Sequence, residues 1–149
     1  MALPCDYPDE GLVPISGFSG MCIVPPDHPL ATAETVCLEQ LTSEPLIGLP
    51  GSAVWRMRVE AAFDELGHSF VPVVEAQAEI TDLVRAGVGL AIVDPFTART
   101  AEMTGVVACR IAPAIPYEMA ILYPVTRSRS RLAVALASHV RDAADLMHV

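Results

Sequence analysis

The sequence predicts an α/β fold, with a mostly parallel sheet that carries helices on both faces. Two observations support this prediction. Short apolar runs alternate along the chain with segments whose apolar residues recur at helical spacing, and this alternation is typical of parallel sheets covered by helices. The run at 90–93 is apolar at every position, which is typical of a strand that is buried on both faces.

Length and composition suit one globular domain or two small lobes. The chain has 149 residues, of which 52% are hydrophobic and 18% are charged, so it can build a packed core and does not resemble a disordered chain. No apolar run is long enough to span a bilayer. The N-terminus lacks the basic and apolar regions of a signal peptide. We therefore expect a cytoplasmic protein without membrane contact.

Charge and cysteine content exclude several classes of function. The net charge of −9 repels a phosphate backbone, so we expect no nucleic-acid contact by this chain itself. The four cysteines show no C-x-x-C spacing and are expected to be reduced thiols. The four histidines are scattered without partners at metal-ligand spacing. No catalytic motif is present, so we expect no metal, no cofactor and no enzymatic activity.

The first part of the chain is predicted to be irregular and then to form short elements. Residues 1–20 are rich in proline, glycine and acidic residues and have no apolar period, so we expect an irregular lead-in. A strand is predicted at 21–24, where two prolines end it, followed by a short helix at 35–41 and a strand at 46–49.

The first long helix is predicted to begin at Ser52, because its hydroxyl can accept a hydrogen bond from backbone amides of the first turn. Gly67 is expected to end this helix, and a strand follows at 70–74. One stripe of the helix is apolar, and its members are Trp55, Val59, Phe63 and Leu66.

The next helix leads into the central stretch of the chain. It is expected to end at Gly87, where a helix C-cap favours a residue that can adopt positive φ. The strand at 90–93 follows, and Asp94 then breaks it. Pro95 suits the first turn of a further helix.

Two strands, at 106–111 and 117–123, are predicted before a long final helix that begins at Ser128 or Ser130. The apolar side of that helix is expected to contain Leu132, Leu136, Val140, Ala143 and Met147.

Two of the predicted helix starts are candidate anion sites. A helix N-terminus offers unpaired amides and a partial positive charge, so it attracts carboxylates. Ser52 and Ala53 lie at one such start, and Gln77 and Ala78 lie at another. Both starts follow strands that point the same way. A structural role remains open for each, because Ser52 can be a plain N-cap and Gln77 a solvated residue.

A third candidate group follows the strand at 90–93, where ligands bind in open α/β sheets. Asp94 and Thr97 could meet an ammonium or hydroxyl group of a ligand, and Phe96 could form a pocket wall. The structural alternatives are that Asp94 only caps the following helix and that Phe96 belongs to the core.

Four segments of the sequence resemble the effector-binding domain of LysR-type transcriptional regulators. Residues 22–31 match its P-x-x-H-P-L-A ending, and residues 41–47 match its E-P-L-I segment. Residues 84–94 match V-x-A-G-x-G-[IL]-A-[IL]-[VL]-[DP], and residues 127–140 match its closing helix. The order is that of the family. The stretch from Asp94 to Ala98 resembles the branch that senses amino acids and opines.

The resemblance implies a periplasmic-binding-protein type 2-like fold with two subdomains and an effector between them. The family places its ligand carboxylate against loops equivalent to those at Ser52 and Gln77. The chain is expected to lack the winged helix-turn-helix domain, the linker helix and the first part of subdomain I. The expected divisions are a lead-in at 1–20, subdomain II at 21–110 and the C-terminal part of subdomain I at 111–149.

These observations predict an effector-sensing domain that binds a small carboxylate, with amino-acid-like molecules as one class. Binding would be coupled to subunit packing and, through the missing DNA-binding domain, to transcription. An exposed sheet edge and unmatched apolar surface predict a homo-oligomer. The alternatives are a stand-alone small-molecule-binding protein of the same fold, a degenerate enzyme lobe, or a dimerisation remnant without a ligand.

Overall fold

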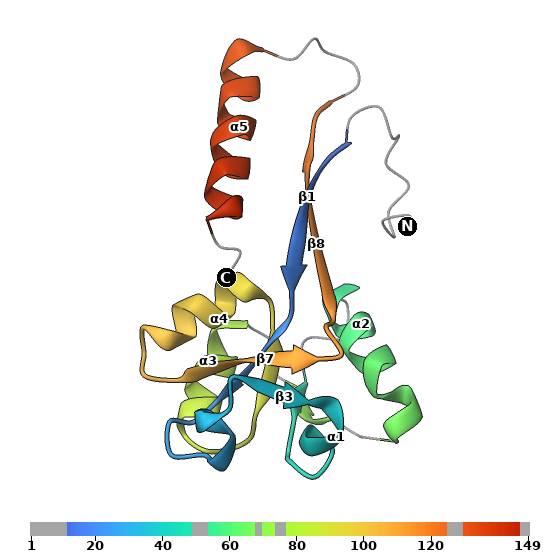
Figure 1. Ribbon diagram of the computed structural model, residues 1–149, viewed down its shortest axis with the longest axis vertical. Helices are drawn as coiled ribbons and strands as arrows, with labels where there is room; N and C mark the ends of the chain where they lie inside the picture. The colour runs from blue at the N-terminus through green and yellow to red at the C-terminus, as the bar shows by residue number, and fades with distance from the viewer. Residues whose placement is uncertain (1–11, 49–53, 68–69, 74–76, 125–129, 147–149) are drawn as a thin grey trace. The chain divides into compact units, whose positions relative to one another are not determined.

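The computed structural model describes residues 12–48, 54–67, 70–73, 77–124 and 130–146 (Figure 1). These residues belong to two compact units, which we call unit 1 (Met1–Phe18 and Glu118–Val149) and unit 2 (Ser19–Tyr117). The elements in chain order are β1 (Leu12–Ser19), β2 (Met21–Val24), β3 (Thr35–Cys37), α1 (Leu38–Leu41), β4 (Ile47–Gly48), α2 (Val54–Phe63), β5 (Val71–Val73), α3 (Gln77–Arg85), β6 (Ala91–Val93), α4 (Pro95–Glu102), β7 (Val107–Ala112), β8 (Pro116–Leu122) and α5 (Arg131–Asp145).

The sheet of unit 2 is mostly parallel, as the sequence predicts. Four of its strands have the order β3-β7-β2-β6, and a parallel bridge between Leu46 and Leu90 connects β6 to the β4-β5 pair. The β3-β7 and β4-β5 pairs are parallel, whereas β2 is antiparallel to both β6 and β7. Among the described strands of this unit, β2 therefore runs against all the others.

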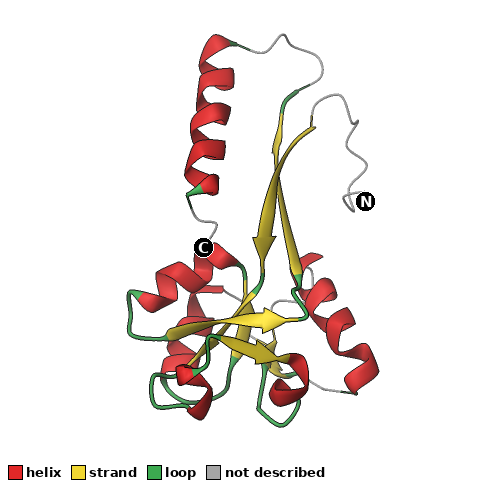
Figure 2. Ribbon diagram, in the orientation of Figure 1, coloured by secondary structure: helices red, strands yellow, loops and turns green. Residues whose placement is uncertain are grey.

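Helices cover both faces of this sheet (Figure 2). Successive residues of a strand point to opposite faces, and the buried residues accordingly divide into two clusters. Cys22 and Ile92 belong to the first cluster, which also contains Leu41 of α1 and Val59 and Phe63 of α2. The second cluster contains Ile23 and Val93 with residues of α3 and α4, namely Ile80, Val84, Ala98 and Ala101. The predicted α/β class and its doubly covered strands are confirmed.

The two glycines of the Ala-Gly-Val-Gly segment are required for different structural reasons. Gly87 follows α3 with φ +74°, and hydrogen bonds from Gly87 N to Val84 O and from Val88 N to Leu83 O close the helix end as a Schellman motif. Gly89 allows close backbone approach, because a Cβ atom there would lie 2.4 Å from the carbonyl oxygen of Pro45. Leu90 N donates to the same oxygen at 2.8 Å.

The expected irregular lead-in is wrong for residues 12–19, which form β1 and pair with β8. Ile15 and Phe18 of β1 are both buried. Pro14 and Gly17 suggested a loop, but an edge strand tolerates proline because it leaves one row of backbone groups unpaired. Residues 1–11 lie outside the described part of the chain.

The helix expected at 35–41 is only half correct. Residues Thr35–Cys37 form β3, which pairs with β7 and buries Val36. β-branched residues favour a strand when a neighbour is available for pairing. The helix α1 begins after Cys37, whose N–H donates to Oε1 of Gln40 at 2.8 Å.

Unit 1 contains the β1-β8 ribbon and the helix α5. Ser130 is the N-cap of α5, since its Oγ accepts from Ala133 N at 3.1 Å, which decides between the two predicted starts. The predicted apolar side of the helix is not its buried side. Leu132 and Leu136 are 80% and 64% exposed. The buried positions are instead Ala137 and Ala144.

No helix among the described residues is long and apolar enough to cross a membrane. The boundaries of unit 2 lie at Ser19 and Tyr117, whereas the sequence suggested 21 and 110 for subdomain II. The assignment of the units to subdomains II and I remains a prediction.

Candidate functional site

One edge of the unit 2 sheet collects the features that can recognise a ligand. The strands β4, β5 and β6 run in the same direction, so their carboxyl ends lie at the same edge. The helices α2, α3 and α4 follow these strands in sequence and begin at that edge. This arrangement is the usual ligand-binding edge of an open α/β sheet.

Asp94 caps α4 with both of its carboxylate oxygens. Oδ1 accepts from the backbone N–H groups of Phe96 and Thr97, each at 3.0 Å, and Oδ2 accepts from the Thr97 hydroxyl at 2.7 Å. Asp94 is 6% exposed, so these bonds compensate the burial of its charge. Asp94 therefore caps α4, and the Thr97 hydroxyl donates to it. A role of either residue in ligand binding stays a prediction.

Phe96 belongs to an aromatic group at the same edge. Its ring meets that of Tyr117 with centroids 6.3 Å apart, and Tyr117 meets Trp55 edge-on at 5.2 Å. Burial and the nearby Asp94 charge raise the pKa of Tyr117 above its usual value. Phe96 is half-buried and belongs to neither core cluster, whereas Trp55 packs against both. The aromatic group can form an apolar wall for a ligand.

Sequence reasoning missed Trp55 and Tyr117 as members of the site. Trp55 was assigned to the apolar stripe of its helix, and Tyr117 to a strand. Trp55 Nε1 is buried and has no hydrogen-bond partner among the described residues. Its position one turn into the predicted helix was the only sequence signal that could have placed it near the edge.

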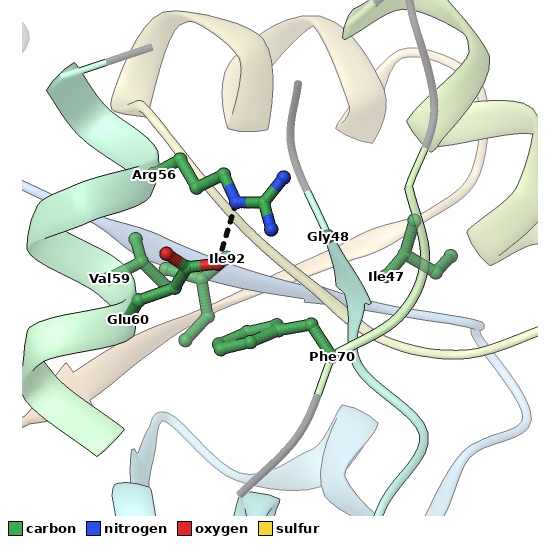
Figure 3. A pocket seen from close by; sticks show the side chains of 7 residues that line it. All are labelled: Ile47, Gly48, Arg56, Val59, Glu60, Phe70 and Ile92. Carbon is green, nitrogen blue, oxygen red and sulfur yellow. Dashed lines mark hydrogen bonds and ion pairs between the residues drawn. The ribbon is translucent and has the colours of Figure 1, made fainter. Parts of the chain in front are cut away.

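A small hollow lies beneath α2 (Figure 3). Its empty volume is about 230 Å³, which includes open solvent at the mouth. The lining residues are Ile47, Gly48, Arg56, Val59, Glu60, Phe70 and Ile92. Arg56 Nε donates to Glu60 Oε1 at 2.6 Å. The hollow could not be predicted from the sequence, because its residues come from four separate elements or loops.

The structure does not test the four residues that are predicted to bind a carboxylate. Ser52 and Ala53 lie outside the described residues. Gln77 and Ala78 form the start of α3, and only their backbone is described. Their predicted role in binding a carboxylate is therefore untested.

Potential metal ligands and thiols form the last group of candidate residues. In the described ranges, no group of three or more His, Cys, Asp or Glu side chains could hold a metal ion. Cys22 and Cys109 face each other across β2 and β7 and are both fully buried. Burial raises the pKa of both thiols, and the raised pKa of Cys22 also reflects the nearby Cys109 and Glu44. Both thiols are therefore poor nucleophiles.

Comparisons with known proteins agree with this architecture. Residues 1–145 match the family described as LysR substrate binding domain. The chain is 34% identical over 140 residues to the regulatory protein NocR of Agrobacterium tumefaciens (strain T37), covering 93% of this chain and 47% of NocR. It is 28% identical to the transcriptional activator protein LysR of Escherichia coli (strain K12), covering 81% of this chain and 40% of LysR. The chain thus spans less than half the length of these relatives.

A solved structure shows the same fold. The reduced form of the OxyR regulatory domain from Pseudomonas aeruginosa superimposes with a TM-score of 0.73 and 21% sequence identity, covering 95% of this chain and 70% of that domain. At this level of identity the similarity concerns the fold alone.

Proposed function

Because the chain belongs to the LysR substrate binding domain family, we propose that it is the effector-sensing part of a transcription regulator. We propose that its effector is a small carboxylate, with amino-acid-like molecules as one class. The observation that supports this proposal most is the edge of unit 2 at which three parallel strands end and three helices begin.

The carboxylate is proposed to bind the amino ends of α2 and α3. Unpaired amides and the helix dipole favour an anion at such an end. The amino end of α4 already has its own anion, since Asp94 accepts from two of its amides. Our candidate residues for the carboxylate are Ser52, Ala53, Gln77 and Ala78.

The third loop would contact the rest of the effector. The buried negative charge of Asp94 favours an ammonium group nearby, although its oxygens already cap α4. Thr97 is proposed to orient Asp94, and Phe96 with Tyr117 is proposed to form the apolar wall. In this arrangement Asp94 is away from the carboxylate of an amino-acid-like molecule and near its ammonium group.

Binding is proposed to change the packing of subunits in a homo-oligomer and thereby to regulate transcription in the cytoplasm. The resemblance to a regulatory protein and to a transcriptional activator supports this role. The acidic chain itself is proposed to make no DNA contact. We propose that this contact is made by a winged helix-turn-helix domain, as the family resemblance implies.

A second candidate function is subunit packing without a ligand. The exposed leucines of α5 favour it, because large apolar side chains on one helix face are typical of an interface. A stand-alone small-molecule-binding protein of the same fold is a further alternative. Both differ from the main proposal in a measurable way, since only a sensor couples ligand binding to subunit packing.

Thermal unfolding of the purified chain in the presence of amino acids, opines and dicarboxylates tests the proposal. A ligand that binds only the folded state raises its stability by about 2.7 kcal/mol at a hundredfold excess over Kd. We expect at least one carboxylate to stabilise the chain and Ser52→Ala to weaken that effect. If no carboxylate changes the unfolding temperature, the sensor proposal is wrong and the packing role without a ligand is favoured.

A further inference from the structure

The chain passes between units 1 and 2 at two places, after Phe18 and after Tyr117. We call the residues of unit 2 at these places, 19–21 and 115–117, the connecting segments. They are bonded to each other, because Gly20 N donates to the carbonyl oxygen of Ile115 at 2.8 Å. A displacement of one connecting segment therefore alters a bond to the other.

Helix α2 contacts both connecting segments near its amino end. The Trp55 ring lies so close to Gly20 that a side chain at position 20 would overlap with it, and the same ring meets Tyr117 edge-on at 5.2 Å. Three residues further along the helix, Arg58 Nη1 donates to the carbonyl oxygen of Pro116 at 3.3 Å. Trp55 is the second residue of α2, so these contacts lie at the end of the helix where the effector carboxylate is proposed to bind.

The polar group of Trp55 opposes the packed position of its ring. Nε1 is buried and has no hydrogen-bond partner among the described residues, whereas most buried donors have one. A position of the ring in which water reached this N–H would satisfy it. The packed ring is therefore easier to release than an apolar ring of the same size, which is a property of an element with two arrangements.

We infer that Trp55 is a positioning residue that couples the amino end of α2 to both connecting segments. An effector bound at this end of the helix would then act on the two segments through one side chain. This consequence rests on the proposed function, which places the carboxylate at the amino ends of α2 and α3. The coupling of α2 to the segments is a property of the chain without ligand.

Amide hydrogen exchange of the purified chain without ligand tests the coupling. The Gly20 N–H is bonded to Ile115, so it exchanges when the connecting segments separate. Trp55→Leu is expected to raise the exchange rate of this amide about tenfold more than the rates in the β2-β7 ladder. Phe63→Leu is the matched control, since Phe63 is a buried ring of the same helix in the first core cluster. It is expected to affect Gly20 and the ladder equally.

A second pair of variants separates the contact from a general loss of stability. Trp55→Phe shortens the ring and is expected to raise the exchange of the residue 20 amide. The further change Gly20→Ala fills the vacated space and is expected to restore protection. Protection factors are compared, because glycine and alanine amides differ in their intrinsic exchange rates. A merely destabilising effect of Trp55→Phe would not be reversed by a methyl group at the contact position.

Glutamate and glutarate serve as probes of the effect of a bound carboxylate. Calorimetric titration establishes which of them binds, and exchange is then measured at saturation. We expect the bound probe to change the exchange rate of the Gly20 amide about threefold or more in the unmodified chain. In Trp55→Leu we expect the probe to bind without this change, because the proposed carboxylate contacts do not include Trp55.

The outcomes separate the inference from the proposed function. Equal effects of Trp55→Leu on Gly20 and on the ladder, or a probe-induced change at Gly20 that persists in Trp55→Leu, overturn the inference and leave the carboxylate sensor intact. If neither probe binds, the exchange rates of the chain without ligand alone decide the inference. Absence of stabilisation by every carboxylate contradicts the proposed function and not the coupling.

Discussion

A Cβ atom at Gly20 would lie 2.5 Å from Cη2 and 2.7 Å from Cζ2 of Trp55. Gly20 lies between β1 and β2, and its N–H donates to the carbonyl oxygen of Ile115 at 2.8 Å. Trp55 also meets Tyr117, at the start of β8, edge-on. The indole of α2 therefore packs against the start of β2 and the start of β8 at once, and only a glycine leaves room for it.

Gly20→Ala is expected to destabilise the chain by about 1–3 kcal/mol, because the added methyl group cannot avoid a rigid ring. Trp55→Phe removes the two ring atoms that clash, so the double variant is expected to be more stable than the sum of the single effects predicts. Urea unfolding of the unmodified chain, the two single variants and the double variant measures the coupling free energy between the two positions. Additive effects of the two changes would contradict the packing relationship.

The cap at α4 allows structural and binding roles of Asp94 to be separated. Asp94→Ala is expected to cost about 0.5–2 kcal/mol of stability, because two amides and the Thr97 hydroxyl lose their acceptor. Asp94→Asn keeps an acceptor of similar rank and is expected to retain most of this stability. If Asp94 also attracts the ammonium group of an effector, Asp94→Asn weakens the binding of amino acids but not that of simple diacids. Equal affinities for both ligand classes in Asp94→Asn would argue against the ammonium contact.

The raised pKa of Tyr117 predicts that the folded chain loses stability at alkaline pH. Burial and Asp94 raise its pKa in the folded chain. The folded state therefore keeps a proton that the unfolded state releases above about pH 10. The contribution of Tyr117 to the free energy of unfolding is therefore complete below that pH. It is lost as the pH rises through the folded-state pKa. Unfolding free energies measured across this range should fall less steeply for Tyr117→Phe. Identical slopes would show that the hydroxyl of Tyr117 is not shielded.

The exposed face of α5 predicts self-association. Leu132 and Leu136 are one helical turn apart and largely exposed, and burying them against a second copy would stabilise an oligomer. Light scattering of the chain is expected to show an oligomer that the double change Leu132→Ser and Leu136→Ser dissociates. Val134→Ser serves as a control on a different side of the helix. A monomer at all concentrations would contradict this prediction.

Much of unit 2 could be predicted from the sequence because its signals are local. The apolar run that became β6, the glycine that ends α3 and the aspartate that caps α4 all act on residues within one turn or one strand. The order of strands and helices follows from such signals. The family motifs point to the same order.

Features that depend on distant partners could not be predicted in the same way. The sequence does not show that β1 pairs with β8 or that β2 runs against its neighbours, because both depend on residues far along the chain. Trp55 and Arg56 follow one another in α2 yet belong to the aromatic group and to the hollow, respectively. Their roles appear only when β4, β6 and β8 are in place.

The most direct test of the account is a fluorescence titration, because Trp55 is the only tryptophan in the chain and lies on the helix whose amino end is proposed to bind the effector. We expect a carboxylate that stabilises the chain to change the emission of Trp55 in a saturable way, with the same Kd that calorimetry gives. Stabilisation by a carboxylate without any change in this emission would contradict binding at this edge of unit 2.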